Sequence, residues 1–446
     1  MQEAGSLLVK LLEKQKVDRV FCVPGESYLS VMNGLQETSI ETILCKHEGA
    51  ASMMAEADGK LTGRPGIAFV TRGPGATNAA SGIHIAQQDS TPMILFVGQI
   101  GKEMYGRDAF QEVDYQQFYG GMAKLVIEVQ QSDRLSEIFS RAYHTAMSGR
   151  PGPVIIALPE NMLTEKTDKK PLEFIDQLMS APTTKDLAQF IEEIKEAKNP
   201  IVVLGGSIWS HEAEKDLISI SEMLGLTIIT SHRRQSYYNN LHKNYGGDLG
   251  LGVNPKLIDR INNSDYLVLL GGRLSENPSQ GFTLLGIPEH NKKFIHIHPG
   301  SEEIGRIYKP HLGIVSNPIA FVNILNNALK GLNTKPNSNN ELNAVKSHEE
   351  YIEWGDMPLE APNSGVDLTS AFRTLRKHLD PNTIITNGAG NYAVWGHRLF
   401  RFTKVKTQLA PISGSMGYGL PAAIAAKLRS VSYTHLTLPT SRGVWV

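Results

Sequence analysis

Glu48 lies at a junction where an ionisable side chain could do chemistry. In the stretch KHEGAAS it follows the apolar run 41–45 and precedes a small-residue segment, 49–62. A carboxylate in the first turn of a helix is stabilised by the helix dipole and by free backbone N–H groups, and most such glutamates do no more than this. The position alone therefore favours a structural role, and a catalytic role needs support from elsewhere in the chain.

Glycine-containing turns follow several apolar runs. They are Pro24-Gly25, 73–75, 205–206, 271–272, 388–390 and 414–415. In a parallel sheet, ligands bind beyond the carboxyl ends of the strands, and glycine lets backbone amides approach a phosphate. One such turn is typical of an ordinary loop, whereas six at comparable places indicate a nucleotide-like ligand. None completes G-x-G-x-x-G, which disfavours a simple Rossmann dehydrogenase.

Other kinds of site find little support. The His and Cys residues lack the spacing of a metal site, and no G-x-S-x-G elbow of a serine hydrolase occurs. His296 and His298 alternate along an apolar run and are typical of structural residues. His84 lies on a helix predicted over 76–90 that faces the crevice of the first domain, and a lone helix histidine more often has a structural role.

The elements that must position these residues alternate along the chain. Over 1–165, continuous apolar strands alternate with helices, which is typical of a parallel sheet covered on both faces. A polar linker is predicted over 166–185, a second α/β unit over 186–330 and a second linker over 331–365. A third unit opens at 366. The predicted fold is therefore α/β, with three doubly wound parallel-sheet domains of which the third is incomplete.

The final residues do not continue this pattern. After the helix predicted over 419–428, the stretch RSVSYTHLTLPTSRGVWV shows neither helix nor strand periodicity. We therefore expect the third domain to cover 366–429 and to be truncated, and residues 430–446 to be a non-native tail. Resequencing the coding DNA tests this expectation.

Composition excludes several classes of partner. A chain of 446 residues is expected to form about two to four domains. The net charge of -1 gives no sign of nucleic acid or anionic membrane as a partner, and no uncharged apolar run reaches the ~18 residues of a membrane span. Cys22 and Cys45 lie in apolar runs and are predicted to be reduced, as in a cytoplasmic protein.

Taken together, these motifs resemble thiamine-diphosphate-dependent enzymes of the acetolactate synthase group, large (catalytic) subunit. The matching segments are VFCVPGES, KHEGAAS, GPGATN, DAFQEVD, RPGPVIIALPENM, FIHIHPGSEEIGR, GAGNYAVW and GSMGYGLPAA, in the family's order over residues 1–429. The resemblance implies an N-terminal pyrimidine-binding domain over 1–165, a central Rossmann-like domain over 186–330 and the start of a diphosphate-binding domain over 366–429.

The resemblance also implies an activity. It is decarboxylation of a 2-oxo acid, pyruvate, with carboligation to 2-acetolactate, a reaction of branched-chain amino acid biosynthesis. A sister enzyme with another 2-oxo acid and a non-catalytic homologue stay open as alternatives. The family's site lies between the first domain of one subunit and the third of another, which implies a homodimer or homotetramer. Neither nucleic acid nor membrane is an expected partner.

Glu48 gains a catalytic task from the resemblance. The family's glutamate hydrogen-bonds N1′ of the aminopyrimidine of thiamine diphosphate and favours the 4′-imino tautomer, which removes the C2 proton. The small residues after Glu48 leave room for the ring. Gln111, next to Phe110, is the second catalytic candidate, because both match residues that face the reacting carbon.

Other site residues carry over by position. The implied cofactor contacts, besides Glu48, are Pro24, Gly25, Gly75, Asn78, Gly388, Gly390, Asn391, Gly414, Ser415 and Met416. The implied substrate contacts are Phe110, Gln87, His84 and Lys124. Met416 matches the apolar residue that props the cofactor in its bent shape. Asn391 stands where acetolactate synthases tend to carry Gln or His, and Glu26 departs from their Pro-Gly-Gly-Ala turn.

Two departures concern further cofactors. The family holds Mg²⁺ and the diphosphate with a Gly-Asp-Gly segment and a downstream Asn, and no Gly-Asp-Gly occurs in this chain. We therefore predict no metal ligands and no turnover by the 446-residue chain. FAD stays open, because the Arg-Phe-Asp-Asp-Arg turn of acetolactate synthases is replaced by Arg-Leu-Ser-Glu-Asn at 273–277.

Overall fold

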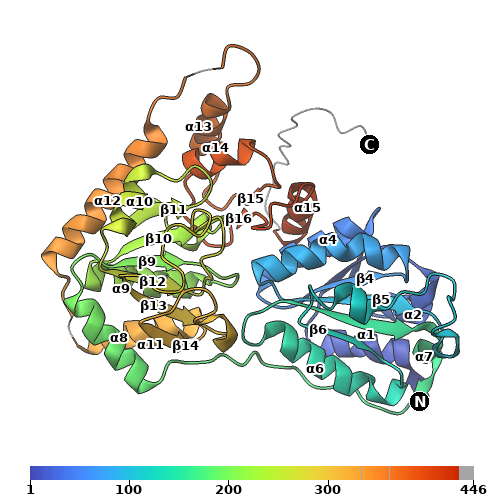
Figure 1. Cartoon of the computed structure of the whole chain (residues 1–446). Helices are drawn as coiled ribbons and strands as arrows, with labels where there is room; N and C mark the ends of the chain where they lie inside the picture. The colour runs from blue at the N-terminus through green and yellow to red at the C-terminus, as the bar shows by residue number, and fades with distance from the viewer. Residues whose placement is uncertain (333, 361, 431–446) are drawn as a thin grey trace.

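Two six-stranded parallel sheets and a smaller third unit make up the protein (Figure 1). The computed structural model describes residues 1–332, 334–360 and 362–430. The predicted α/β fold is confirmed for these residues. The predicted tail, apart from residue 430, lies outside them.

The first sheet has the strand order β3-β2-β4-β5-β7-β6. Its strands are β2 (Arg19–Cys22), β3 (Glu41–Leu44), β4 (Gly66–Val70), β5 (Met93–Gln99), β6 (Leu125–Glu128) and β7 (Pro153–Pro159). Its helices are α1 (Ala4–Lys14), α2 (Leu29–Gln36), α3 (Glu48–Thr62), α4 (Pro74–Asp89), α5 (Tyr115–Tyr119), α6 (Leu135–Met147) and α7 (Glu160–Thr164). Every residue of β4, β5 and β7 is buried, as continuous apolar strands between two helix layers require.

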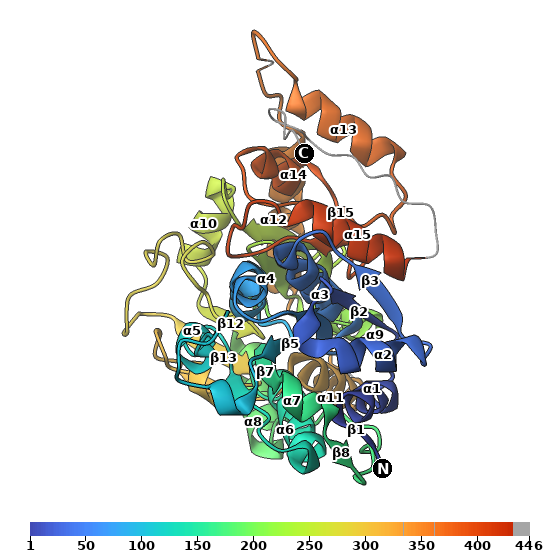
Figure 2. The same cartoon turned by 90° about the vertical axis from the view of Figure 1, so that its right-hand side faces the viewer.

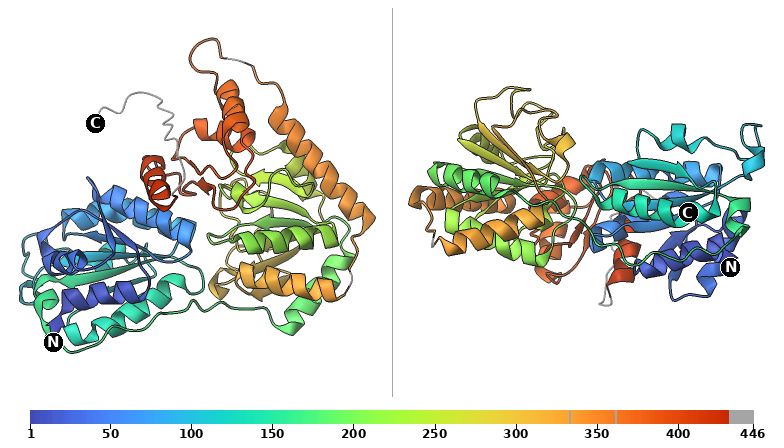
Figure 3. Two further views of the ribbon diagram at one scale, coloured as in Figure 1. Left: turned by 180° about the vertical axis from the view of Figure 1, so that it is seen from behind. Right: turned by 90° about the horizontal axis from the view of Figure 1, so that it is seen from below.

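Helices cover both faces of this sheet. Side chains of α1, α2 and α6 fill one core, and side chains of α3 and α4 fill the other. Two short strands, β1 (Gln2–Glu3) and β8 (Lys166–Thr167), pair antiparallel just past the predicted boundary at 165. The segment 168–183 then crosses to the middle domain without helix or strand (Figure 3). It is tied to the first domain where Ile175 N donates to Gln15 Oε1 at 2.8 Å.

The second sheet has the order β11-β10-β9-β12-β13-β14. Its strands are β9 (Ile201–Leu204), β10 (Thr227–Ser231), β11 (Tyr245–Leu249), β12 (Tyr266–Leu270), β13 (Lys293–His298) and β14 (Leu312–Val315). The helices around it are α8 (Thr184–Glu196), α9 (His211–Leu224), α10 (Pro255–Asn262), α11 (Pro318–Gly331) and α12 (Ser338–Asp356). The strand order reverses between β9 and β12, which is the switch point of a doubly wound sheet.

The third unit is small in the described part of the chain. It contains α13 (Leu368–His378), β15 (Ile385–Thr386), α14 (Tyr392–Leu399), β16 (Gln408–Leu409) and α15 (Gly419–Arg429). The strands β15 and β16 form a parallel pair. Beside this pair lies an apolar cleft of about 620 Å³, whose lining includes Leu368, Phe372, Leu375, Ile385 and Phe400.

Helix α15 joins the third unit to the first. It packs along α3, and its alanines Ala422, Ala425 and Ala426 lie in the same core as the apolar residues of α3 (Figure 2). Small side chains allow this close approach of two helices. Among the described residues, no helix is long and apolar enough to cross a membrane.

Candidate active site

Glu48 begins α3, directly beyond the end of the edge strand β3. The helix is capped by His47, whose ring Nδ1 accepts from Gly49 N at 3.0 Å. The Glu48 carboxylate is instead held by a neighbouring helix, because Asn78 Nδ2 donates to Glu48 Oε2 at 3.0 Å. Glu48 is half-buried and Asn78 is exposed. A simple capping role therefore does not account for the position of this carboxylate.

Two glycines lie where the starts of α3 and α4 come together. A Cβ on Gly75 would lie 3.4 Å from Glu48 Oε1 and 2.8 Å from Thr71 Cγ2. A Cβ on Gly49 would lie 3.3 Å from the carbonyl oxygen of Asn78. Two helix N-termini thus converge on Glu48, with free backbone N–H groups and positive partial charge.

The turn after β2 packs against the turn after β4. A Cβ on Gly25 would lie 2.4 Å from Thr71 Cβ, and Ser27 Oγ lies 2.8 Å from Thr71 Oγ1. Pro24 is exposed beside this contact. Thr71 therefore connects two of the predicted cofactor turns, a role that no sequence motif indicated.

Gln111 lies over the same turn of β4. Its φ of 65° is in the left-handed region, and a Cβ on Gly73 would lie 2.7 Å from Gln111 Cβ. Only a glycine at position 73 permits this approach. The neighbouring Phe110 is 75% exposed. Gln111 therefore lies at the carboxyl edge of the sheet, the edge that carries Glu48.

His84 and Gln87 lie farther along α4. At the helical rise they are about 9 and 14 Å beyond Asn78. His84 is exposed, while Gln87 is half-buried and its carbonyl accepts from Arg150. Gln87 thus faces the junction with the middle domain.

Lys124 is not brought to this group of residues. It precedes β6, so it lies at the amino edge of the parallel sheet, whereas Glu48 lies at the carboxyl edge. Its ammonium donates to Ser148 O at 2.6 Å, and its aliphatic chain packs on Gly152. Within a single chain, Lys124 therefore lies away from Glu48, and its contact with the substrate stays a prediction.

In the third domain, the two predicted cofactor turns meet. Ala389 N donates to Ser415 O at 3.2 Å, and a Cβ on Gly388 would lie 3.2 Å from that oxygen. Gly390 and Gly414 have positive φ angles of 146° and 68°, which favour glycine.

Two further predicted residues flank these turns. Asn391 is exposed directly before α14, and Met416 is 80% exposed. Neither side chain is held inside the domain, so both are open to a ligand or to a second chain.

Tyr418 ties this turn to α3 and was missed by the sequence analysis. Its hydroxyl donates to Glu56 Oε2 at 2.7 Å, and both side chains are fully buried. Burial raises the pKa of Glu56 above its ordinary value, although Lys60 opposes the rise. Two charged residues, Glu56 and Lys60, inside the small-residue helix 49–62 could have indicated a buried polar contact of this kind.

A second missed group explains Glu26. Arg72 is buried, and it forms ion pairs with Glu26 at 3.2 Å and with Glu160 at 2.7 Å. The side chain of Glu26 is thereby drawn to Arg72, next to the Pro24-Gly25 turn. The charge that departs from the family's pattern has a partner within the same domain.

Metal ligands are not assembled in the described part of the chain. No group of three or more His, Cys, Asp or Glu side chains there is arranged to hold a metal ion. The described residues therefore do not fit Mg²⁺.

Three models of one enzyme family match the chain. The N-terminal binding domain of thiamine pyrophosphate enzymes matches residues 2–118, their central domain 187–325, and their C-terminal binding domain 388–444. The chain belongs to the thiamine pyrophosphate enzyme family. The last match extends into residues 431–444, which lie outside the described residues.

Curated relatives agree with this family. The chain is 29% identical to a probable acetolactate synthase large subunit of Methanococcus aeolicus, over 94% of this chain and 73% of the relative. It is 28% identical to the acetolactate synthase large subunit of Corynebacterium glutamicum, over 94% of this chain and 67% of the relative. A chloroplastic acetolactate synthase of Arabidopsis thaliana is also 28% identical. The predicted resemblance is confirmed, and the chain is a thiamine-pyrophosphate-dependent enzyme.

Proposed function

We propose that this enzyme decarboxylates pyruvate and couples it to a second pyruvate, giving 2-acetolactate and CO₂. The observation that carries the proposal is the Glu48 carboxylate, fixed by Asn78 at the meeting point of two helix N-termini. The names of the relatives support the reaction, since those relatives are acetolactate synthases.

The residues of the first domain fit the aminopyrimidine end of thiamine diphosphate. Bound thiamine diphosphate supplies the electron sink that decarboxylation of a 2-oxo acid needs. Asn78 holds Glu48 Oε2, which leaves Oε1 to share a proton with the ring nitrogen N1′. Gly75 keeps the start of α4 free of a Cβ beside Oε1. Glu48 is thus positioned to hold and return one proton at N1′.

The residues of the third domain fit the diphosphate end. Gly388, Gly390 and Gly414 carry no Cβ in two adjoining turns, so a phosphate could approach the backbone closely there. In the single chain, the amides of Gly388 and Gly414 donate to Tyr392 Oη and Pro411 O. Because the Mg²⁺ ligands of the family are not assembled among the described residues, we propose that the 446-residue chain by itself does not turn over. Pyruvate consumption by this chain at the rate of an active enzyme would contradict that statement.

A homodimer or homotetramer completes the proposal. Phe110 and Met416, the apolar side chains assigned to the site, are 75% and 80% exposed in the single chain. Large apolar side chains at such exposure favour a partner surface. Size-exclusion chromatography with light scattering measures the assembly, and a monomer at assay concentration would argue against it.

The substrate assay distinguishes the two leading candidates. Turnover of pyruvate and of larger 2-oxo acids is compared on the product of the resequenced gene, and binding of thiamine diphosphate is measured on that product and on the 446-residue chain. Acetolactate from pyruvate supports the proposal. Preference for a larger 2-oxo acid supports the sister enzyme, which the Arg72–Glu26 pair beside the Pro24-Gly25 turn favours. No binding of thiamine diphosphate by either protein would support a non-catalytic homologue.

We also propose a cytoplasmic location. Cys22 and Cys45 are both free thiols, which the reducing cytoplasm preserves. Cell fractionation with an antibody to the protein tests this location.

A further inference from the structure

The middle domain has a crevice where a dinucleotide is expected to bind. It lies at the carboxyl ends of β9, β10 and β12, next to the switch point of the sheet. Glycine turns at 205–206 and 271–272 line it. In the acetolactate synthase group this is the domain assigned to FAD, so the fit of FAD can be tested on these residues.

The crevice is too small for a dinucleotide. Its volume is about 30 Å³, which is the space of about one water molecule. A neighbouring cavity beyond Arg273 adds about 130 Å³, whereas ligand pockets usually measure about 300–1,000 Å³.

The two glycine turns close the crevice by touching each other. A Cβ on Gly205 would lie 2.5 Å from Gly272 Cα, and a Cβ on Gly206 would lie 2.8 Å from Gly271 O. Glycine here allows two backbones to meet and leaves no cradle between them. Phosphate groups therefore have no open turn to approach.

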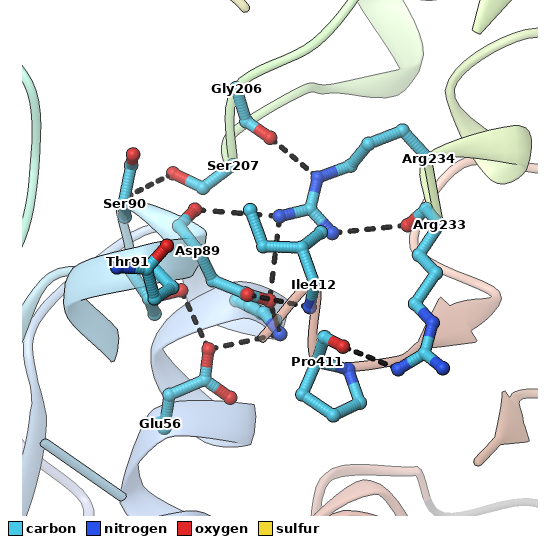
Figure 4. A network of polar contacts seen from close by, with 12 residues as sticks. Glu56, Asp89, Ser90, Thr91, Gly206, Ser207, Arg233, Arg234, Pro411 and Ile412 are labelled. Atoms are coloured by element: carbon cyan, nitrogen blue, oxygen red, sulfur yellow. Dashed lines mark hydrogen bonds and ion pairs between the residues drawn. The ribbon is translucent and has the colours of Figure 1, made fainter. Parts of the chain in front are cut away.

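The side chain of Arg234 lies in the remaining space (Figure 4). Its Nε donates to Gly206 O at 2.7 Å, and one terminal nitrogen donates to Arg233 O at 3.0 Å. The other terminal nitrogen faces Asp89 Oδ2, at the end of α4, at 3.4 Å. Arg234 is 5% exposed. It bonds to the glycine turn and to the first domain at the same time.

A buried network of charged side chains surrounds Arg234. Asp89 also pairs with Lys60, and Lys60 pairs with Glu56 at 3.0 Å, so two acidic and two basic side chains share the junction. Burial opposes ionisation of Asp89, but Lys60 and Arg234 outweigh it and hold its pKa below the ordinary value.

The third domain joins this network as well. Ile412 N donates to Asp89 Oδ1 at 2.8 Å, and Arg233 donates to Pro411 O (Figure 4). Side chains and backbone of all three domains thus meet at one buried place, where a dinucleotide would otherwise lie.

We propose that the middle domain of this enzyme binds no FAD, and that Arg234 replaces the dinucleotide as the part that joins the middle domain to the first. The residues do not fit FAD, so the flavin left open by the family resemblance is not part of this chain. The proposal concerns the middle domain alone and holds whichever 2-oxo acid is the substrate.

The first test measures flavin on the purified 446-residue chain. We expect no flavin fluorescence to be released when the protein is denatured. We also expect no saturable quenching of the protein's tryptophan fluorescence when FAD or ADP is added to the folded chain. Far-ultraviolet circular dichroism shows that the chain is folded. Stoichiometric flavin in the purified protein, or saturable FAD binding, would overturn the proposal. These readouts need no thiamine diphosphate, so they stand apart from the proposed activity.

The second test breaks the junction. Arg234→Ala leaves Asp89 with one basic partner fewer in a buried place, which is costly. Scanning calorimetry is expected to show the first and middle domains unfolding in separate transitions, where the unchanged protein shows one. Arg260→Ala is the matched control, because Arg260 pairs with Glu350 inside the middle region and spans no domain boundary. If Arg234→Ala does not fold, Asp89→Asn removes the same ion pair at nearly constant volume. Identical unfolding of the junction and control variants would overturn the role of Arg234.

Discussion

The first and middle domains share one kind of sheet but use its carboxyl edge differently. Both sheets have six parallel strands with glycine turns beyond them. In the first domain, Gly75 keeps the start of α4 beside the Glu48 carboxylate, and Asn78 is exposed next to it. In the middle domain, the turns at Gly205 and Gly272 touch, and Arg234 lies in what remains. A glycine turn therefore shows that two backbones come close together. Whether a ligand also fits depends on the side chains that the neighbouring domain packs against the turn.

The largest expected effect comes from Glu48→Gln, which removes the carboxylate that shares a proton with the cofactor. We call the carboxyl edge of the first sheet, which carries Glu48, the open edge, and that of the middle sheet, which carries Arg234, the closed edge. Pyruvate consumption by the product of the resequenced gene, and C2-proton exchange of its thiamine diphosphate, are expected to fall by roughly 10²–10⁴-fold. Glu37→Gln is the control, because Glu37 is an exposed glutamate beyond α2. C2-proton exchange at the normal rate in the Glu48→Gln variant would show that Glu48 is not catalytic, and the proposed difference between the two sheet edges would be wrong.

Gly75→Ala tests whether the open edge depends on its missing Cβ. The new methyl group meets Thr71 Cγ2 at 2.8 Å, so the Thr71 side chain must shift, and it would lie in contact with Glu48 Oε1 at 3.4 Å, in space beside the carboxylate. We expect the affinity for thiamine diphosphate to fall about tenfold, which corresponds to roughly 1.4 kcal/mol. Isothermal titration calorimetry measures the change. An unaltered affinity would show that the cofactor does not depend on the space left by Gly75 beside Glu48.

Gly205→Ala is the counterpart at the closed edge. Its Cβ would lie 2.5 Å from Gly272 Cα, which is backbone and cannot rotate away. The free energy of unfolding is expected to fall by about 1–3 kcal/mol, with the affinity for thiamine diphosphate unchanged. Denaturant unfolding and calorimetry test both halves of this statement. A loss of cofactor affinity without a loss of stability would show that the middle edge binds ligand.

A smaller effect is expected from Asn78→Ala, which removes the hydrogen bond to Glu48 Oε2. A hydrogen bond to a charged group contributes about 1.5 kcal/mol, so kcat is expected to fall roughly tenfold. The control is Asn33→Ala, since Asn33 is exposed on α2. Equal rates for the two variants would mean that Glu48 is positioned by its own helix alone.

The smallest expected effect concerns Asp248, at the junction of the middle and third domains. Gln235 Nε2 donates to Asp248 Oδ1 at 3.1 Å and to His397 O at 2.6 Å. Burial raises the pKa of Asp248 to about 7, although Gln235 opposes the rise. The folded protein therefore binds this proton more tightly than the unfolded chain, and its stability falls as pH rises through the window from ~4 to about 7.

Asp248→Asn removes that titration. We expect the variant to melt about 2 °C above the unchanged protein near pH 8, and the difference to vanish below pH ~4. Melting curves across this pH range measure it. A variant that is less stable at the higher pH would show that ionised Asp248 supports the junction.

Much of the fold was predictable because its signals are local. The continuous apolar runs of β4, β5 and β7 predicted buried parallel strands, and the turns beyond them predicted the sheet edge of the site. For such features, the local pattern of apolar residues and turns is enough to predict the structure. Glu48 was noticed because it follows a predicted strand, but its catalytic role and that of Gln111 were predicted from the family resemblance.

The remaining features depend on contacts between distant parts of the chain. Tyr418 bonds Glu56 across 362 residues, and Arg234 faces Asp89 across 145. No local pattern encodes such pairs, so the glycine turn at 205–206 predicted a ligand where Arg234 lies.

Helix α3 has a consequence for exchanging parts between related enzymes. Its first turn carries Glu48, and its later turns carry Glu56 and Lys60, which bond to the third domain and to α4. A chimera that receives the first domain from a relative could leave Tyr418 and Arg234 without Glu56 and Asp89 in a dry interior, because those two partners belong to the first domain. Productive recombination between such enzymes therefore requires that α3, Tyr418 and Arg234 be inherited together.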